Sequence, residues 1–239
     1  QYHRRRGRRL AMTSGADRLK TGLVLFPGVT PLDAVGPYEV FARAPELEVL
    51  LIAKTKGAVA GELGLTLVAD VDFAAAPDLD ILCVPGGTGI VQAASDAATI
   101  DFLKRQGAAA RFVTSVCTGA LLIGAAGLLK GYRATTHWLS LDLLPLVGAI
   151  PVDERVVKDR NRITSAGITA GIDFALALVG EISGQRRAAE IELMLQYDPA
   201  PPFKSGHPKI ADPMLVQGLS GARRALQEER RTFFAELTI

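Results

Sequence analysis

The chain has 239 residues, of which 49% are hydrophobic and 22% are charged. It is long and apolar enough for a sizeable core, and its composition excludes disordered, collagenous and disulfide-rich proteins. Five of its 27 basic residues lie among the first nine positions, so the remainder has 22 basic and 25 acidic residues and a net charge of −3. This mildly acidic body gives no charge signal for nucleic-acid binding.

The basic run QYHRRRGRRLA at the start of the chain is followed by the polar segment TSGADRLK rather than by an apolar stretch. This is not the pattern of a secretory signal peptide, and we expect residues 1–20 to form a disordered basic extension outside the fold. Cys83 and Cys117 are too few for a disulfide framework. They favour a reducing compartment and therefore a cytoplasmic protein.

Strand and helix patterns alternate from residue 21 onward. The expected strands are 21–26, 46–54, 79–87 and 111–117, and the expected hairpins are 57–70 and 152–167. The expected helices are 31–44, 96–110, 118–129, 137–146, 168–184 and 186–197, the last with Ile191, Leu193, Met194 and Leu195 on its apolar side. This alternation predicts one α/β domain over residues 21–197, with a mostly parallel sheet covered on both faces.

Two further segments need an interpretation. The uncharged run 112–129 is as long as a membrane span, but its polar residues and glycines predict a buried strand, a tight turn and a helix, and no membrane association. Residues 198–239 contain a Pro-rich segment and a charged helix at 222–237. We expect this part to be an appendage or a dimer arm.

Cys117 is the strongest candidate for chemistry. Ligands of open α/β sheets bind beyond the carboxyl ends of the strands, and Cys117 lies at such an end, before small residues. This pattern predicts a sharp elbow that exposes the thiol, and amides at the helix start that lower its pKa. Cys83 lies inside a strand, where a buried and inert thiol is expected.

The other candidate residues follow from the needs of a thiol nucleophile. Gly87 and Thr118 can offer backbone amides as an oxyanion-type hole, although the double glycine is also typical of a plain tight turn. His137 is either structural or part of the pocket, and Asp33 is either an acid/base group or only a favourable charge at a helix start. The residues that we expect to contact the substrate are Gly86, Gly87, Thr118 and His137. Glu39 and His207 are expected at the surface, and no spacing typical of a metal site occurs.

Four segments together resemble the ThiJ/PfpI superfamily over roughly residues 21–210: LFPGVTPLDAVGPYEVFAR, ILCVPGGTG, VTSVCTGALLIGAAGLLKGYRATTHW and RITSAGITAGIDFALALV. The resemblance implies a flavodoxin-like three-layer sandwich with a mostly parallel sheet, a cysteine on a nucleophile elbow, a homodimer and no cofactor. It also implies that Cys117 is the nucleophile, that Asp33 is the acid/base carboxylate and that Thr118 is required beside them.

Within the superfamily the resemblance is to the branch that hydrates isonitriles to N-substituted formamides, which implies a small apolar substrate in a mostly apolar pocket. Thr118 stands where protease-like members carry His, so peptidase activity is disfavoured. Two alternatives remain open. One is a ligand- or redox-sensing domain without turnover, although the segment after YDPAPPF is short for the DNA-binding region of the regulator branch. The other is a glyoxalase or deglycase acting on α-oxoaldehydes.

Overall fold

The computed structural model describes residues 18–237. Most of the expected basic extension therefore lies outside the described residues. The first strand begins at Leu19, two residues before the expected position, and the Arg18 side chain donates a hydrogen bond to Leu47 O.

The elements follow the predicted alternation. The strands are β1 (Leu19–Leu25), β2 (Leu47–Ala53), β3 (Gly57–Ala60), β4 (Thr66–Ala69), β5 (Val71–Asp72), β6 (Ile81–Val84), β7 (Phe112–Val116), β8 (Arg133–Ala134), β9 (Ile150–Pro151), β10 (Val156–Asp159) and β11 (Arg162–Ser165). The helices are α1 (Pro31–Phe41), α2 (Ile90–Ser95), α3 (Ala97–Ala109), α4 (Gly119–Ala125), α5 (Ala170–Ser183), α6 (Gln185–Leu195), α7 (Pro213–Ala222) and α8 (Arg224–Glu236), with 3-10 helices η1 (Glu62–Gly64) and η2 (Trp138–Val147).

Seven strands form one sheet in the order β10-β11-β7-β6-β1-β2-β5. Its neighbouring strands are parallel except for the β10–β11 hairpin, which is antiparallel. The chain winds outward from β1 in both directions, which is the arrangement of doubly wound flavodoxin-like sheets. The prediction of a mostly parallel sheet is confirmed.

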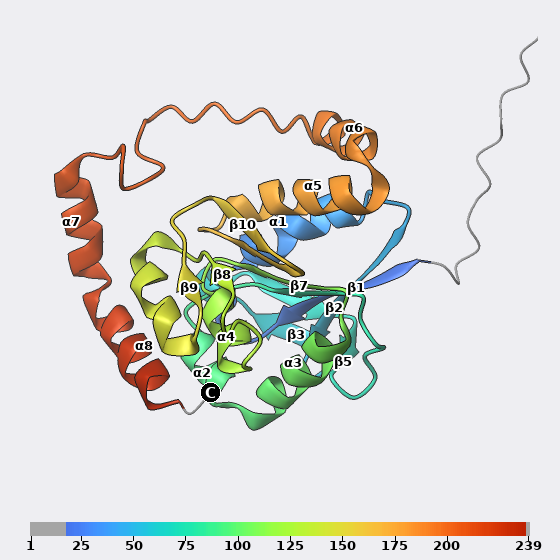
Figure 1. Ribbon diagram of the computed structural model, residues 1–239, viewed down its shortest axis with the longest axis horizontal. Coiled ribbons are helices and arrows are strands. Elements are labelled where there is room, and N and C mark those ends of the chain that lie inside the picture. Colours follow the sequence, from blue (N-terminus) through green and yellow to red (C-terminus); the bar gives the residue numbers. More distant parts are fainter. Residues whose placement is uncertain (1–17, 238–239) are drawn as a thin grey trace, which may run out of the picture.

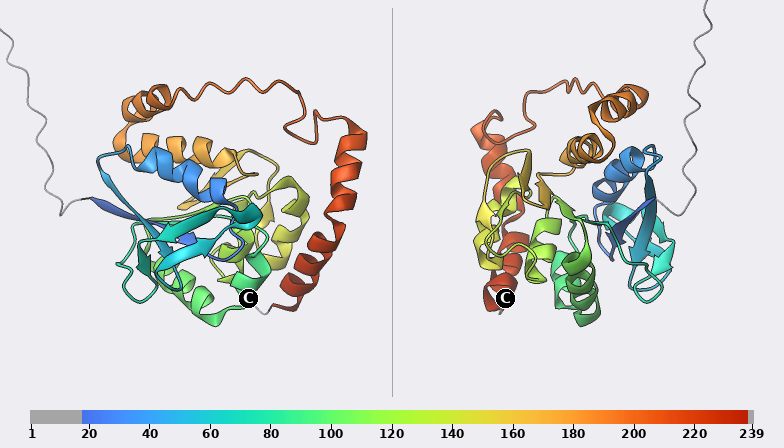
Figure 2. Two further views of the ribbon diagram at one scale, coloured as in Figure 1. Left: turned by 180° about the vertical axis from the view of Figure 1, so that it is seen from behind. Right: turned by 45° about the vertical axis from the view of Figure 1, so that its right-hand side comes forward.

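Helices cover both faces of this sheet (Figures 1 and 2). One apolar core lies between the sheet and α1, α5 and α6, and the other between the sheet and α2, α3, α4, η2 and α8. Strand β1 contributes to both cores because its side chains alternate: Leu23 and Leu25 face the first, and Val24 faces the second. The fold is therefore a three-layer sandwich with a sheet buried on both sides.

Three local predictions differ from the structure. Residues 138–147 form a 3-10 run instead of an α-helix, and Pro145 inside it cannot donate the backbone hydrogen bond that an α-helix requires. Helix α2 was not expected, and α4 is shorter than predicted. On α6, Ile191 is buried but Leu193 and Met194 are exposed, so the expected apolar side was wrong for these two residues.

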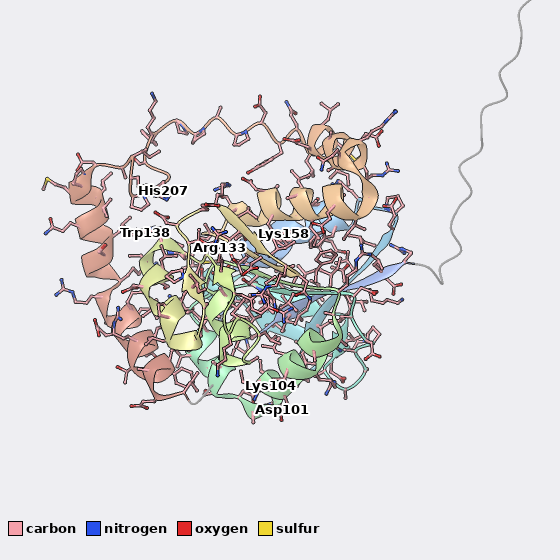
Figure 3. All side chains as sticks on the ribbon, viewed as in Figure 1. Asp101, Lys104, Arg133, Trp138, Lys158 and His207 are labelled. Atoms are coloured by element: carbon pink, nitrogen blue, oxygen red, sulfur yellow. The ribbon has the colours of Figure 1, made fainter. Side chains whose placement is uncertain are left out.

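The C-terminal part divides into two. A segment without regular structure leads from α6 to α7, and Trp138 and His207 face the same cavity beside α7 (Figure 3). No side chain of α7 is buried, whereas α8 packs against η2 and buries Arg230 and Phe234. The interpretation of the whole tail as an appendage is therefore wrong for α8, which is part of the second core. Within residues 18–237 no helix has the length and apolarity needed to span a membrane.

Candidate active site

Cys117 lies in the turn between β7 and α4. Its φ of 55° is in the left-handed region, which is unfavourable for a residue with a side chain. The turn is held by hydrogen bonds on both sides: the Cys117 amide donates to Ser165 O (3.1 Å) and Ala166 O (3.0 Å), and its carbonyl accepts from Thr136 Oγ1 (2.7 Å). The structure thus has the sharp elbow that the sequence predicts, but Cys117 on it is buried, so the expected exposure of the thiol was wrong.

Two glycines allow the end of β6 to approach this elbow closely. A Cβ at Gly119 would lie 2.0 Å from Val84 O, and a Cβ at Gly86 would lie 2.5 Å from Thr118 N. Both distances are shorter than any van der Waals contact, so a side chain at either position would push the two strand ends apart. The small residues after Cys117 are therefore required by packing at this site.

Asp33 lies in the first turn of α1 and is completely buried. Its Oδ2 accepts a hydrogen bond from the Gly86 amide (2.9 Å), and its Oδ1 is buried with no hydrogen-bond partner among the described residues. The Cys117 thiol lies close enough to the carboxyl group for each to change the pKa of the other. Burial raises the pKa of Asp33 to about 7, the Gly86 amide opposes this shift, and the negative charge of Glu62 adds to it. The structure thus brings Asp33 and Cys117 together, and near neutral pH the carboxyl group can both give and take a proton.

The expected low pKa of Cys117 was wrong for this structure. Burial raises the thiol pKa above its ordinary value, and the neighbouring Asp33 carboxylate raises it further. The backbone amides of Ile168 and Thr118 hydrogen-bond to the sulfur and act in the opposite direction, as does the charge of Arg230. The thiol and the carboxyl group therefore form a coupled pair in which the first proton leaves mainly from Asp33.

Cys83 is buried as predicted. It is completely inaccessible in β6, and burial raises the pKa of its thiol to about 12. It does not line the cavity at Cys117.

The glycine loop has a different role from the one expected. The Gly87 amide donates to Thr118 Oγ1 (3.1 Å), so it is occupied by this hydroxyl group rather than directed at the substrate. The Gly86 amide is bound to Asp33. Of the two amides expected near the sulfur, those of Gly87 and Thr118, only the Thr118 amide acts on it. The second amide that acts on the sulfur is that of Ile168. Ile168 itself has a φ of 31°, which is unusual for a β-branched residue.

His137 lines the cavity beside Cys117 and is also the N-cap of η2. Its Nδ1 accepts a hydrogen bond from the Leu139 amide (3.3 Å), so the proton of the neutral ring lies on Nε2. Burial lowers the pKa of His137 to about 4, and the charges of Arg230 and Arg223 lower it further. His137 is therefore neutral at pH 7 and can donate a hydrogen bond from Nε2.

The cavity at Cys117 has a volume of about 110 Å³ and is small, as expected. Its lining is a mixture of polar and apolar groups, so it is less apolar than the mostly apolar pocket that was expected. The lining residues are Thr30, Glu62, Gly87, Thr88, Cys117, Thr118, His137, Leu139, Ile168, Arg223, Leu226, Gln227 and Arg230. A more apolar cavity of about 400 Å³ adjoins it and shares Thr30, Glu62 and Ile168 with it.

Sequence reasoning missed three kinds of site residue. Glu62 lies on a hairpin loop, where its side chain accepts a hydrogen bond from Thr30 Oγ1 (2.7 Å), and nothing in its sequence context distinguishes it. Ile168 acts through its backbone amide, which leaves no sequence signal. Arg230 did leave one: it lies four residues after Leu226 and four before Phe234, so a cation occupies the apolar stripe of a helix.

Comparisons with known proteins agree with this geometry. Residues 20–181 match the model of the DJ-1/PfpI family. The chain is 52% identical over 198 residues to a Pseudomonas putida protein named isonitrile hydratase, covering 83% of this chain and 87% of that protein. It is 35% identical over 137 residues to the HTH-type transcriptional regulator GbdR of Pseudomonas aeruginosa, covering 56% of this chain and 37% of the regulator. A crystal structure of a ThiJ/PfpI family protein from Pseudomonas syringae superposes with a TM-score of 0.90 at 39% identity, covering 97% and 98% of the two chains.

Proposed function

This chain belongs to the DJ-1/PfpI family, and from this premise we propose that it hydrates isonitriles, R–N≡C, to N-substituted formamides, with Cys117 as nucleophile and Asp33 as acid and base. The observation that carries the proposal is the burial of the Asp33 carboxyl group beside the Cys117 thiol, with one carboxyl oxygen left without a hydrogen-bond partner among the described residues. The 52% identity to a protein named isonitrile hydratase supports the choice of substrate.

The first step needs a nucleophile and a proton at one carbon atom, because the terminal carbon of an isonitrile has carbene character. The Cys117 sulfur forms a bond to this carbon while the thiol proton, passed through Asp33, is delivered to the same carbon. The product is a thioimidate, R–N=CH–S–Cys117, and Asp33 is again a carboxylate.

The second step consumes one water molecule. Asp33 takes a proton from water while the water oxygen bonds to the thioimidate carbon, and the nitrogen receives that proton. The C–S bond then breaks and the remaining hydroxyl proton returns through Asp33 to the sulfur, which releases R–NH–CHO and restores the thiol. In this scheme Thr118 keeps its amide on the sulfur and its hydroxyl on the Gly87 amide, while the neutral His137 can bind the nitrogen end of the substrate.

The substrate needs a place for its hydrocarbon group. We assign this group to the apolar cavity next to the Cys117 cavity, which is lined by Pro31, Leu32, Val35, Leu63 and Leu65 in addition to the three shared residues. Burial of a hydrocarbon group against these side chains is favourable by roughly 25 cal/mol per Å². The Cys117 cavity would then hold only the reacting N≡C group and water.

The proposal includes the oligomeric state of the protein and its cellular compartment. Leu193 and Met194 on α6 and Met214, Leu215 and Leu219 on α7 are large exposed apolar side chains, which favours a homodimer that covers them. Both cysteines are free, which is compatible with a reducing cytoplasm.

A second function has one observation in its favour. The 35% identity to a transcriptional regulator indicates that this fold is also used in regulation, so ligand sensing without turnover is the competing hypothesis. A sensor does not need a carboxyl group with a pKa near 7 beside the thiol. The two hypotheses therefore differ in whether Asp33 is required.

The direct test is an assay with cyclohexyl isocyanide, in which the formamide is followed by chromatography. We expect multiple turnovers per protein chain, and no turnover of methylglyoxal in a parallel assay. Binding of the isocyanide without formamide would support the sensor. Consumption of methylglyoxal alone would support a glyoxalase.

A further inference from the structure

Arg230 is a buried cation without an acidic partner. Its side chain is 5% exposed, and none of the ion pairs among residues 18–237 includes it. Burial of an unpaired charge destabilises a folded protein unless polar groups compensate for the lost water. The position of this arginine on the apolar side of α8 therefore requires an explanation.

Neutral dipoles hold the guanidinium in place. Nη2 donates to Gly87 O (2.9 Å) and Nη1 donates to Ser140 Oγ (3.3 Å). The Gln227 amide oxygen accepts from Nη1 (3.2 Å) when its nitrogen faces Leu139 O (3.1 Å). The third nitrogen, Nε, is buried and has no hydrogen-bond partner among the described residues. These contacts fix the orientation of Arg230 without an ion pair. Burial lowers the pKa of its guanidinium, and the carboxylates of Glu62 and Glu229 act on it only from beyond ion-pair distance, in the opposite direction.

The charge of the guanidinium faces the Cys117 cavity, whose wall includes Arg230 itself. It acts on the thiol in the direction of a lower pKa. The other titratable groups around the thiol are Asp33 on α1, Glu62 on η1, His137 at the start of η2 and Arg223 before α8. His137 is neutral, and Glu62 adds to the raised pKa of Asp33. The cation that favours the thiolate is therefore Arg230 on α8.

We propose that Arg230 is a positioning residue that stabilises the anionic state of the Asp33–Cys117 pair and holds the Gly87 loop against the elbow. Asp33 and Cys117 exchange one negative charge during the hydration steps described above, so the role of Arg230 in turnover rests on the proposed function. The electrostatic effect of Arg230 on the Asp33–Cys117 pair does not depend on the proposed function. It follows directly from the place of the guanidinium in the cavity wall.

The test is the rate at which iodoacetamide alkylates Cys117, measured as a function of pH, because this reaction requires the anionic pair but no isonitrile. We expect Arg230→Gln to move the midpoint of the pH profile upward by on the order of one unit, since a nearby opposite charge changes a pKa by about that much. Arg230→Lys keeps the charge, so its midpoint should lie close to that of the wild type. Arg231→Gln is the matched control on the same helix, because Arg231 pairs with Asp142 at the surface, and its profile should be that of the wild type.

Folding is checked by circular dichroism and melting temperature for every variant, and Arg230→Met, which keeps the apolar stem, replaces Arg230→Gln if the latter does not fold. The proposal is overturned if the folded neutral variant has the same midpoint as Arg231→Gln. It is also overturned if Arg230→Lys behaves like the neutral variant, since the role would then be one of shape. Where isonitrile turnover is absent in the wild type but the alkylation shift is present, the proposed function fails and the role of Arg230 stands.

Discussion

The elbow at Cys117 and the C-terminal arm, by which we mean helix α8, meet at one cavity but are held there in different ways. The elbow is fixed by backbone hydrogen bonds and by strand ends so close that Gly86 and Gly119 admit no side chain. The arm is fixed by two buried side chains, Arg230 and Phe234, on a helix that is otherwise largely exposed. The comparison indicates a division of tasks: the strand ends present the proposed reacting groups, and a helix docked on the second core contributes the cation beside them.

The largest effect should come from the core, at Cys117. We expect Cys117→Ala to abolish formamide production, because no other described thiol lines the cavity and the sulfur makes the covalent bond in the proposed mechanism. The fold should be retained, as shown by an unchanged sheet signal in circular dichroism. Formamide production by this variant at any substantial rate would exclude covalent catalysis at the elbow.

Asp33→Asn should be nearly as damaging. The amide keeps the size of the side chain but cannot transfer protons, so kcat should fall by at least about 10²-fold. Mass spectrometry after incubation with cyclohexyl isocyanide should show either unmodified protein or a trapped thioimidate, depending on the step that the missing proton limits. Turnover at the wild-type rate would show that Asp33 is only a charge at the helix start.

The pH profile of the wild type tests the coupled pair as a whole. Below about pH 7 both Asp33 and Cys117 hold a proton, because burial raises the Asp33 pKa to about 7. The value of kcat/KM should therefore fall about tenfold per pH unit on the acid side and level off above pH 7. In Asp33→Asn the midpoint near pH 7 should be lost, because the remaining rate follows the raised pKa of the Cys117 thiol and continues to rise above pH 7. A wild-type midpoint near 4 would show that Asp33 is not desolvated in solution.

A smaller effect is expected from the arm, at Phe234. Its side chain is completely buried in the second core, so Phe234→Ala should lower the free energy of unfolding by about 3 kcal/mol. Because α8 carries Arg230, the alkylation midpoint of Cys117 should shift upward as well. Phe233→Ala is the control, since Phe233 is only partly buried. Urea unfolding measures the first effect, and no shift of the midpoint would show that α8 stays docked without Phe234.

Cys83→Ala should have the smallest effect. The thiol is buried in β6 and does not line the cavity, so the variant should lose only about 1 kcal/mol of stability and none of its activity. Thermal unfolding and the formamide assay measure the two quantities. If the Cys83→Ala protein were folded but inactive, the assignment of the chemistry to Cys117 would be wrong.

The elbow and helix α8 also differ in how much of them could be predicted from the sequence. Apolar runs that end at glycines or at Cys117 predicted the strands of the sheet and the elbow, because buried parallel strands and tight turns leave local patterns. The pairing of Cys117 with Asp33 came from a family resemblance, since the two residues are 84 positions apart. The raised thiol pKa could not be predicted, because it depends on how deeply the sulfur is buried. Arg230 was missed because its helix was interpreted by its overall charge, not by the single cation on its apolar stripe.

The match to the family model ends at residue 181, whereas the guanidinium in the cavity wall belongs to residue 230. The boundary of the recognised domain therefore passes through the cavity. A minimal protein cut to residues 20–181 would keep the nucleophile and its acid but would lose one wall and its buried cation. Fusing another module at that point would replace this wall with a new one. For engineering, a truncation should therefore be designed around the cavity instead of the sheet, and it should keep α8 because this helix also completes the second core.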